Sequence, residues 1–293
     1  MPIDEAAPAP QWFTDAVGTP AQEHCLEVDG ARIVYRTWGP EGAPGVLLVH
    51  GGAAHSGWWD HLAPQLAGDR RVAALDLSGH GDSDWRDSYS FDGWAAEVHA
   101  VALAAGVTDQ LLVVGHSLGG LITAKASTLF PDVIDNILII DSEIFHPDQI
   151  RAAQTGGQSV PEIRSTGRRF YPSRDDLLAR YRLVPDHPCY TYAKDYVAAG
   201  SVVEESEGWR WKFDRTFGID LDHRAPMPDP DATVTVIRSG KGRMTAFMAG
   251  EIVSGLRTIS RIVTFPEAGH HVMLDYPLEL LAEIRRAIAR PNP

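Results

Sequence analysis

The decisive stretch of this sequence is Leu111–Gly120, which reads LLVVGHSLGG. Its first four residues are apolar and suit a strand that is buried on both faces of a sheet, whereas the residues from Leu118 onward have helical spacing. Gly115 and Gly119 flank Ser117 in the pattern G-x-S-x-G, in which glycines allow a sharp turn and close packing of strand and helix. We therefore expect Ser117 to be a nucleophile presented at the edge of the sheet. The alternative is a solvated serine in a tight turn.

Apolar runs of strand length recur on both sides of this stretch. They are Gly45–His50, Val72–Leu77, Leu111–Gly115, Ile137–Asp141, Thr233–Arg238 and Arg261–Phe265. Segments with helical spacing alternate with them, and these are Trp58–Leu66, Phe91–Ala105, Leu118–Phe130, Thr245–Leu256 and Pro277–Ala289. Upstream, Leu26–Val28 and Ile33–Trp38 flank an Asp-Gly turn, which is typical of a hairpin. This order predicts an α/β fold with a doubly wound, mostly parallel sheet of eight strands and helices on both faces.

The alternation of strand and helix fails between about Phe145 and Ala225, a segment that holds 11 of the 25 aromatic residues. We therefore expect an N-terminal extension (1–22), a core domain (23–144 and 226–293) and an inserted helical cap or lid (145–225). The aromatic residues of the cap either form a small core of its own or roof a substrate pocket, and both can hold at once. The candidates for such a roof are Trp209, Trp211, Phe213 and Phe217.

The overall charge limits the classes of partner. The chain has 293 residues, 44% of them hydrophobic, and its 26 basic residues face 39 acidic ones, so the net charge is −13. Such a surface repels nucleic acid backbones and anionic lipids, and no apolar run approaches the ~20 residues that a membrane span needs. We expect a small-molecule substrate, no nucleic acid partner and no membrane partner. The sequence allows a homo-oligomer.

Cysteines and ligand spacings give no sign of a metal site or a cofactor. Cys25 and Cys189 are too few for a disulfide framework and lack zinc-binding spacing. His55, His80 and Asp82 match no standard ligand spacing, and the glycine-rich fragments lack a complete dinucleotide or phosphate fingerprint. The first twenty residues lack the basic and apolar regions of a secretory signal. We therefore expect a cytoplasmic protein without metal or cofactor.

A serine hydroxyl needs a neighbouring base to remove its proton, and this chain has twelve histidines. Gly269, His270 and His271 follow the last expected strand and precede the last expected helix. This position places them at the same carboxyl edge of the sheet as Ser117. We expect His270 to be the base rather than His271, because adjacent side chains point in different directions.

Two backbone N–H groups are candidates for holding the negative oxygen of a tetrahedral intermediate. His50, Gly51 and Gly52 follow an expected strand at the same edge of the sheet. There the N–H of Gly52 can join the N–H of Leu118 to form an oxyanion hole. His50 itself is expected to pack the loop rather than to take part in catalysis.

Four motifs together resemble the α/β-hydrolase superfamily, and the match extends over about 26–289. They are His50-Gly51-Gly52, the stretch Asp76–Ser83, the stretch Gly115–Gly120 and the pair Gly269-His270. The resemblance implies a core domain with a lid inserted after the sixth strand. It also implies Ser117 as the nucleophile and His270 as the base, and it does not identify a substrate.

The sequence departs from that superfamily at the acid of the catalytic triad. Members usually carry the acid just after the seventh strand, where this chain reads Arg238–Arg243 without a carboxylate. Asp229 and Asp231 precede that strand and would lie at the wrong end of the sheet. The remaining candidate is Asp141 after the sixth strand, as in some haloalkane dehalogenases and lactone hydrolases, with Glu143 behind it. The alternative role of Asp141 is to cap the loop backbone.

The sequence therefore predicts a cofactor-free serine hydrolase that cleaves a small carboxylic ester or lactone through an acyl-enzyme on Ser117. His270 would be the base, Asp141 would orient it, and the N–H groups of Gly52 and Leu118 would hold the oxyanion. A carbon–carbon bond hydrolase or an amidase of the same fold would use the same residues. A ligand-binding receptor would keep the pocket and the lid without turnover.

Overall fold

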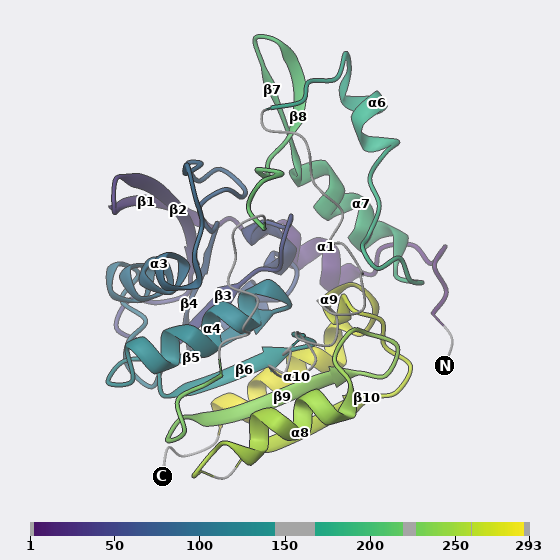
Figure 1. The fold of residues 1–293 in the computed structure, drawn as a ribbon. Coiled ribbons are helices and arrows are strands. Elements are labelled where there is room, and N and C mark those ends of the chain that lie inside the picture. The colour runs from purple at the N-terminus through teal and green to yellow at the C-terminus, as the bar shows by residue number, and fades with distance from the viewer. Residues whose placement is uncertain (1–2, 144–167, 219–226, 259, 290–293) are drawn as a thin grey trace, which may run out of the picture.

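The computed structural model describes residues 3–143, 168–218, 227–258 and 260–289. Its centre is an eight-stranded sheet with the order β1-β2-β4-β3-β5-β6-β9-β10 (Figure 1). The strands are β1 (Gln22–Val28), β2 (Ala31–Trp38), β3 (Gly45–Val49), β4 (Arg71–Leu75), β5 (Leu112–His116), β6 (Asn136–Ile140), β9 (Thr233–Ser239) and β10 (Arg261–Phe265). β2 pairs antiparallel with β1 and with β4, and all other neighbours in this sheet are parallel. The expected doubly wound, mostly parallel α/β sheet is confirmed.

Helices cover both faces of the sheet because its central strands are apolar on both sides. Along β3, Leu47 and Val49 belong to one hydrophobic cluster, whereas Val46 and Leu48 belong to a second cluster on the opposite face. The first cluster includes residues of α3 (Phe91–Ala104), α4 (Leu118–Leu129) and α8 (Ala246–Ser254). The second includes residues of α1 (Gln11–Val17), α2 (Ala63–Leu66), α9 (Val272–Asp275) and α10 (Pro277–Ile288). None of the described helices is both long and apolar enough to cross a membrane.

The N-terminal part of the chain differs from expectation at three places. β1 begins at Gln22 rather than at Leu26, because its pairing with β2 continues out to Thr37. The expected extension contains α1, whose Phe13 is buried in the second cluster. The expected helix 58–66 is divided into the 3₁₀ helix η1 (Ser56–Trp59) and α2. Pro64 stands in the first turn of α2, where a missing N–H breaks no helical bond, so it begins a new helix instead of continuing the first.

Between β6 and β9 the chain leaves the large sheet, and we call residues 168–218 the cap segment. It contains α6 (Arg174–Leu178), α7 (Thr191–Gly200) and a separate antiparallel pair, β7 (Val202–Glu205) and β8 (Gly208–Trp211) (Figure 1). The strand pair corrects the expectation of a purely helical insertion, because valine and tryptophan side chains favour a pleated surface. The expected limits of the cap, at 145 and 225, lie outside the described residues.

Three contacts join the end of the cap segment to loops of the core. The N–H of Asp214 donates to the carbonyl of Gly79 at 2.7 Å, and the Tyr89 hydroxyl donates to the Asp214 carboxylate at 2.7 Å. Lys212 pairs with Asp82 at 2.8 Å. Because Asp214 and Tyr89 are buried, these bonds hold the residues after β8 firmly beside the core.

Candidate active site

Ser117 lies at a strained turn between β5 and α4, where the sequence pattern places it. Its φ of 52° and ψ of −118° are a conformation that side chains with a Cβ rarely adopt. The turn is possible because Gly115 and Gly119 have no Cβ. A Cβ on Gly119 would overlap the backbone of β3, and a Cβ on Gly115 would overlap Gly119. Both positions therefore require glycine.

His270 lies in the loop between β10 and α9 and contacts Ser117 directly. Its Nε2 is 3.0 Å from Ser117 Oγ, and its Nδ1 is 2.7 Å from Asp141 Oδ2. The His270 side chain is almost completely buried. The structure thus brings together the three side chains that the sequence indicates. Asp141 precedes His270 by 129 residues and Ser117 precedes it by 153 residues.

The carboxylate of Asp141 is enclosed by the loop that follows β9. Its two oxygens accept the backbone N–H groups of Ser239 at 3.2 Å, Arg243 at 2.7 Å and Met244 at 3.2 Å, besides the contact with His270. Three backbone N–H groups of this loop therefore fix the position of the Asp141 carboxylate. The loop that lacks an acid of its own therefore supplies the donors that hold Asp141.

Gly52 and Leu118 lie next to each other in the pocket that contains Ser117. A Cβ on Gly52 would be 3.8 Å from the Leu118 side chain and 3.0 Å from the ring of Phe217. Among the described residues, neither the N–H of Gly52 nor that of Leu118 donates a hydrogen bond within the protein. Leu118 is the first residue of α4, where N–H groups have no partner inside the helix.

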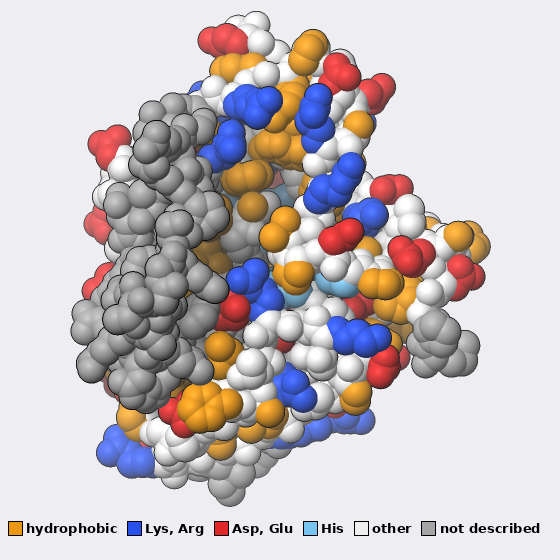
Figure 2. Space-filling model, turned by 45° about the vertical axis from the view of Figure 1, so that its right-hand side comes forward, with side chains coloured by type: hydrophobic (Ala, Val, Ile, Leu, Met, Phe, Trp, Pro, Cys, Tyr) orange, Lys and Arg blue, Asp and Glu red, His pale blue; other side chains and the backbone are white. Residues whose placement is uncertain are grey.

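The pocket around Ser117 has a volume of about 370 Å³ and is lined by both core and cap residues. Of the four expected roof residues, Phe217 lines this pocket. Trp211 and Phe213 line a neighbouring pocket of about 290 Å³. Trp209 is not among the described lining residues of either, and it forms a β-bridge with Tyr171. Figure 2 shows the molecule hollowed between its upper and lower parts, with histidine side chains visible in the hollow.

Two buried groups that the sequence analysis missed hold the loop of His270. His116 Nε2 donates to the carbonyl of His270 at 2.9 Å, and burial together with the nearby His270 lowers the pKa of His116 well below its ordinary value. The N–H of Gly269 donates to Asp275 Oδ2 at 2.6 Å, and burial raises the pKa of Asp275 to about 7. Neither role has a sequence signal, because each depends on where distant segments pack.

His271 contacts the cap segment rather than Ser117. Its backbone N–H donates to His187 Nε2 at 3.1 Å, and the two rings are stacked with centroids 5.0 Å apart. Burial lowers the pKa of both histidines. A neutral pair of rings therefore joins the cap to the loop that carries His270.

Of two other histidines considered in the sequence, His50 holds a loop of the core and His55 binds the cap segment. His50 Nε2 accepts the N–H of Leu77 at 3.1 Å, and burial lowers the pKa of His50 to about 4. His55 Nε2 donates to the carbonyl of Val197 at 3.0 Å. The described residues contain no group of three or more His, Cys, Asp or Glu side chains that could hold a metal ion.

A family model and one relative match this chain over most of its length, and other relatives match part of it. A model of the alpha/beta hydrolase family matches residues 46–284. The esterase Rv0045c of Mycobacterium tuberculosis is 27% identical over 268 residues, which are 88% of this chain and 87% of that protein. A serine hydrolase-like protein of Danio rerio is 32% identical over 133 residues, which are 44% of this chain and 40% of that protein. A solved structure of the M. tuberculosis esterase has the same fold, with a TM-score of 0.70, 21% identity, and coverage of 95% of this chain and 96% of that chain. This chain is a hydrolase and belongs to the alpha/beta hydrolase family.

Proposed function

We propose that this hydrolase cleaves small carboxylic esters or lactones through an acyl-enzyme on Ser117. The observation that carries the proposal is the unbroken series of hydrogen bonds from Ser117 Oγ through His270 to Asp141, at 3.0 and 2.7 Å. In known triads such a series activates the serine. An esterase that is related over most of its length supports an ester as the substrate.

Proton transfer begins at the hydroxyl of Ser117. His270 can accept this proton at Nε2 only when Nε2 carries no proton of its own. The neutral imidazole must therefore be the tautomer that carries its proton on Nδ1. Asp141 Oδ2 favours that tautomer, since it accepts the Nδ1 proton. As Oγ attacks the carbonyl carbon, the proton moves to Nε2, and the Asp141 carboxylate stabilises the imidazolium ion that results.

The attack leaves a negative charge on the former carbonyl oxygen of the substrate. The N–H groups of Gly52 and Leu118 are the donors for this oxyanion, and one such donor contributes about 3 kcal/mol to transition-state stabilisation in known enzymes. Leu118 also stands at the positive end of the α4 dipole, which favours negative charge. The charge therefore develops where the backbone already offers two donors.

The second half of the reaction repeats these steps with water. The first half ends when the His270 imidazolium gives its proton to the leaving alcohol, and in the second half His270 takes a proton from the attacking water. The acid product leaves, and Ser117 recovers its proton. These residues supply proton transfer and charge stabilisation without a cofactor.

A fluorophosphonate probe tests the proposal, because it phosphonylates an activated serine. We expect labelling of the wild-type protein, loss of labelling in Ser117→Ala, and retention in Ser254→Ala, which changes an exposed serine of α8. A panel of 4-nitrophenyl esters, lactones, anilides and vinylogous diketones then identifies the bond that is cleaved. Binding of small molecules without labelling or turnover would identify a receptor and overturn the proposal, as would faster cleavage of anilides or diketones than of esters.

A further inference from the structure

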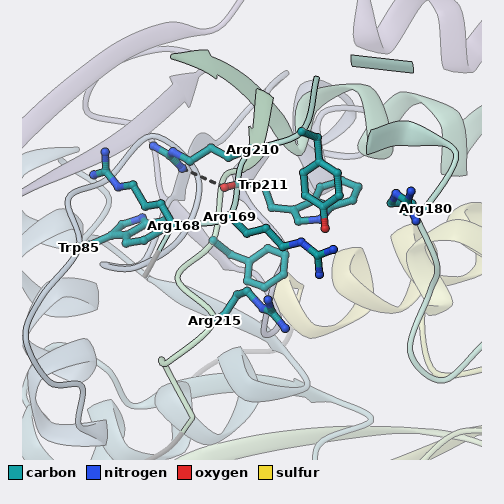
Figure 3. A pocket seen from close by; sticks show the side chains of 9 residues that line it. Trp85, Arg168, Arg169, Arg180, Arg210, Trp211 and Arg215 are labelled. Atoms are coloured by element: carbon teal, nitrogen blue, oxygen red, sulfur yellow. Dashed lines mark hydrogen bonds between the residues drawn. The ribbon is translucent and has the colours of Figure 1, made fainter. Parts of the chain in front are cut away.

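A third pocket, of about 270 Å³, lies on the cap segment and is distinct from the pocket around Ser117. Its walls are aromatic and basic, and its described lining contains no carboxylate. The aromatic residues are Trp85, Tyr171, Trp211 and Phe213. The basic residues that line it are Arg168, Arg169, Arg180, Arg210 and Arg215, of which Arg168 and Arg210 lie beside Trp85 and Arg180 lies on the opposite side of the view (Figure 3). We call this the arginine pocket.

Two of the five guanidinium groups share a single carboxylate. Glu205 pairs with Arg168 at 3.1 Å and accepts a hydrogen bond from Arg210 Nε at 2.7 Å. Both arginines also stack on the ring of Trp85, at 4.9 and 5.0 Å from its centroid. These contacts hold one side of the pocket in place, and they neutralise one positive charge.

The other three arginines have no carboxylate partner among the described residues. Arg169 and Arg180 lie over the ring of Tyr171, at 5.1 and 5.6 Å from its centroid. Arg215 lines the pocket from the segment after β8. Like charges repel one another, so a cluster with one acid for five arginines is most stable when an anion occupies it. The cluster stands out in a chain whose net charge is −13.

The arginine pocket is linked to the pocket around Ser117 by a middle pocket that shares lining residues with both. Arg180, Trp211 and Phe213 also line the middle pocket of about 290 Å³. The middle pocket in turn shares Gly52 and Trp58 with the pocket around Ser117. The three pockets therefore adjoin one another in a series from Ser117 to the arginines.

We propose that the arginine pocket binds an anionic group, a carboxylate or a phosphate, at the end of the substrate remote from the ester bond. This inference rests on the proposed function, because it describes the substrate of the same site. A guanidinium group forms two parallel hydrogen bonds with either anion, and the aromatic walls suit an apolar or planar linker. The substrate class is an ester of a small molecule with a terminal acid, rather than a neutral fatty ester.

A matched series of esters tests the inference by kinetics. The series contains 4-nitrophenyl half-esters of linear dicarboxylic acids, the analogues that end in a phosphate, and neutral 4-nitrophenyl esters of the same lengths. A second series carries the anion on the alcohol side. We expect kcat/KM at one chain length to be at least about tenfold higher for a charged ester than for its neutral match at low salt. The preference should shrink at high salt, because counterions screen the arginines.

The variant Arg169→Gln/Arg180→Gln/Arg215→Gln should lose this preference, so that its kcat/KM for each charged ester falls to that for the neutral ester of the same length, since each glutamine keeps part of the stem and removes the charge. The control is Arg257→Gln, which makes the same change at an exposed arginine paired with Asp231 and should keep the preference. Equal rates for charged and neutral esters at every length would overturn the inference. So would a preference that the triple variant retains. Which anion is preferred distinguishes a carboxylate from a phosphate ligand.

A binding measurement on Ser117→Ala separates this inference from the proposed function. Titration calorimetry with suberate and with phenyl phosphate should show binding that the triple arginine variant in the same background loses, and benzyl alcohol should not bind. If these anions bind but the wild-type protein cleaves no ester, the arginine pocket stands and the proposed function fails. If neutral esters are cleaved and neither anion binds, the proposed function stands and the inference fails.

Discussion

Asp141 Oδ2 lies 2.7 Å from His270 Nδ1, although Asp141 follows β6, His270 follows β10, and β9 lies between these strands in the sheet. The loop after β9 bridges the gap with the N–H groups of Ser239, Arg243 and Met244, which all bind the Asp141 carboxylate. A histidine needs an oxygen at Nδ1 and not an acid at one particular place in the chain. The carboxylate can therefore come from a strand that is not adjacent.

The substitution Asp141→Asn tests the role of that carboxylate. We expect kcat for a preferred ester to fall by ~10³–10⁴, because an amide favours the wrong tautomer of His270 and leaves its charged form unstabilised. The control Asp231→Asn makes the same chemical change at an exposed carboxylate and should leave kcat unchanged. Activity of Asp141→Asn within tenfold of the wild-type value would show that another group is the acid.

The substitution Gly242→Ala tests the loop around the carboxylate. A Cβ at this position would overlap Asp141 Oδ2, so we expect both a lower midpoint of thermal unfolding and a fall in kcat. The matched control is Gly250→Ala in α8, where a Cβ meets nothing within 4 Å. Alanine there should stabilise the protein by up to about 1 kcal/mol through helix propensity, with kcat unchanged. Equal unfolding midpoints for the two variants would contradict the packing described for Gly242.

Stability should fall as the pH is lowered from about 6.5 to about 4. Burial lowers the pKa of His50 and His61 to about 4 and that of His80 to about 3. In this window the unfolded chain binds protons at these histidines and the folded protein does not, so protonation favours unfolding. Each such histidine contributes up to about 1.4 kcal/mol per pH unit to the slope.

Urea unfolding at a series of pH values measures that slope. The variant His61→Phe removes one titrating group and should show a shallower dependence than the wild-type protein, whatever its stability at neutral pH. A free energy of unfolding that does not change between pH 6.5 and 4.5 would mean that these histidines are hydrated in the folded state.

The titration of Asp275 should change stability in the direction opposite to that of the histidines, so that stability falls as the pH rises. Burial raises its pKa from 3.8 to about 7, so between these values the folded protein holds a proton at Asp275 that the unfolded chain has lost. The stability that this protonation contributes is lost as the pH rises toward 7 and above. We therefore compare the free energy of unfolding of Asp275→Asn with that of the wild-type protein. From pH 4 to pH 8 this difference should shift in favour of the variant by a few kcal/mol, on the order of 1.4 kcal/mol per pH unit. An unchanged difference across that range would show that Asp275 is ionised throughout.

Features that depend on neighbours along the chain could be predicted from the sequence. The alternation of apolar runs and helical segments determines the order of the elements, and G-x-S-x-G determines a sharp turn at Ser117. The position of His270 at the same edge of the sheet as Ser117 follows from the order of the elements, because the carboxyl ends of parallel strands meet there. The sequence points to Asp141 because the expected position of the acid holds no carboxylate, and in the structure Asp141 lies against His270. Its function remains a prediction.

Contacts between distant segments could not be predicted in this way. Nothing near His116 in the sequence indicates that it donates to the carbonyl of His270, 154 residues later. Nothing near Arg169 indicates that it shares a pocket with Arg215. The physical reason is that turns and helix ends follow from local sterics and hydrogen bonds, which a few adjacent residues determine. The burial, the charge balance and the hydrogen-bond partners of a side chain follow from which strands and loops pack together, and only the tertiary structure decides that.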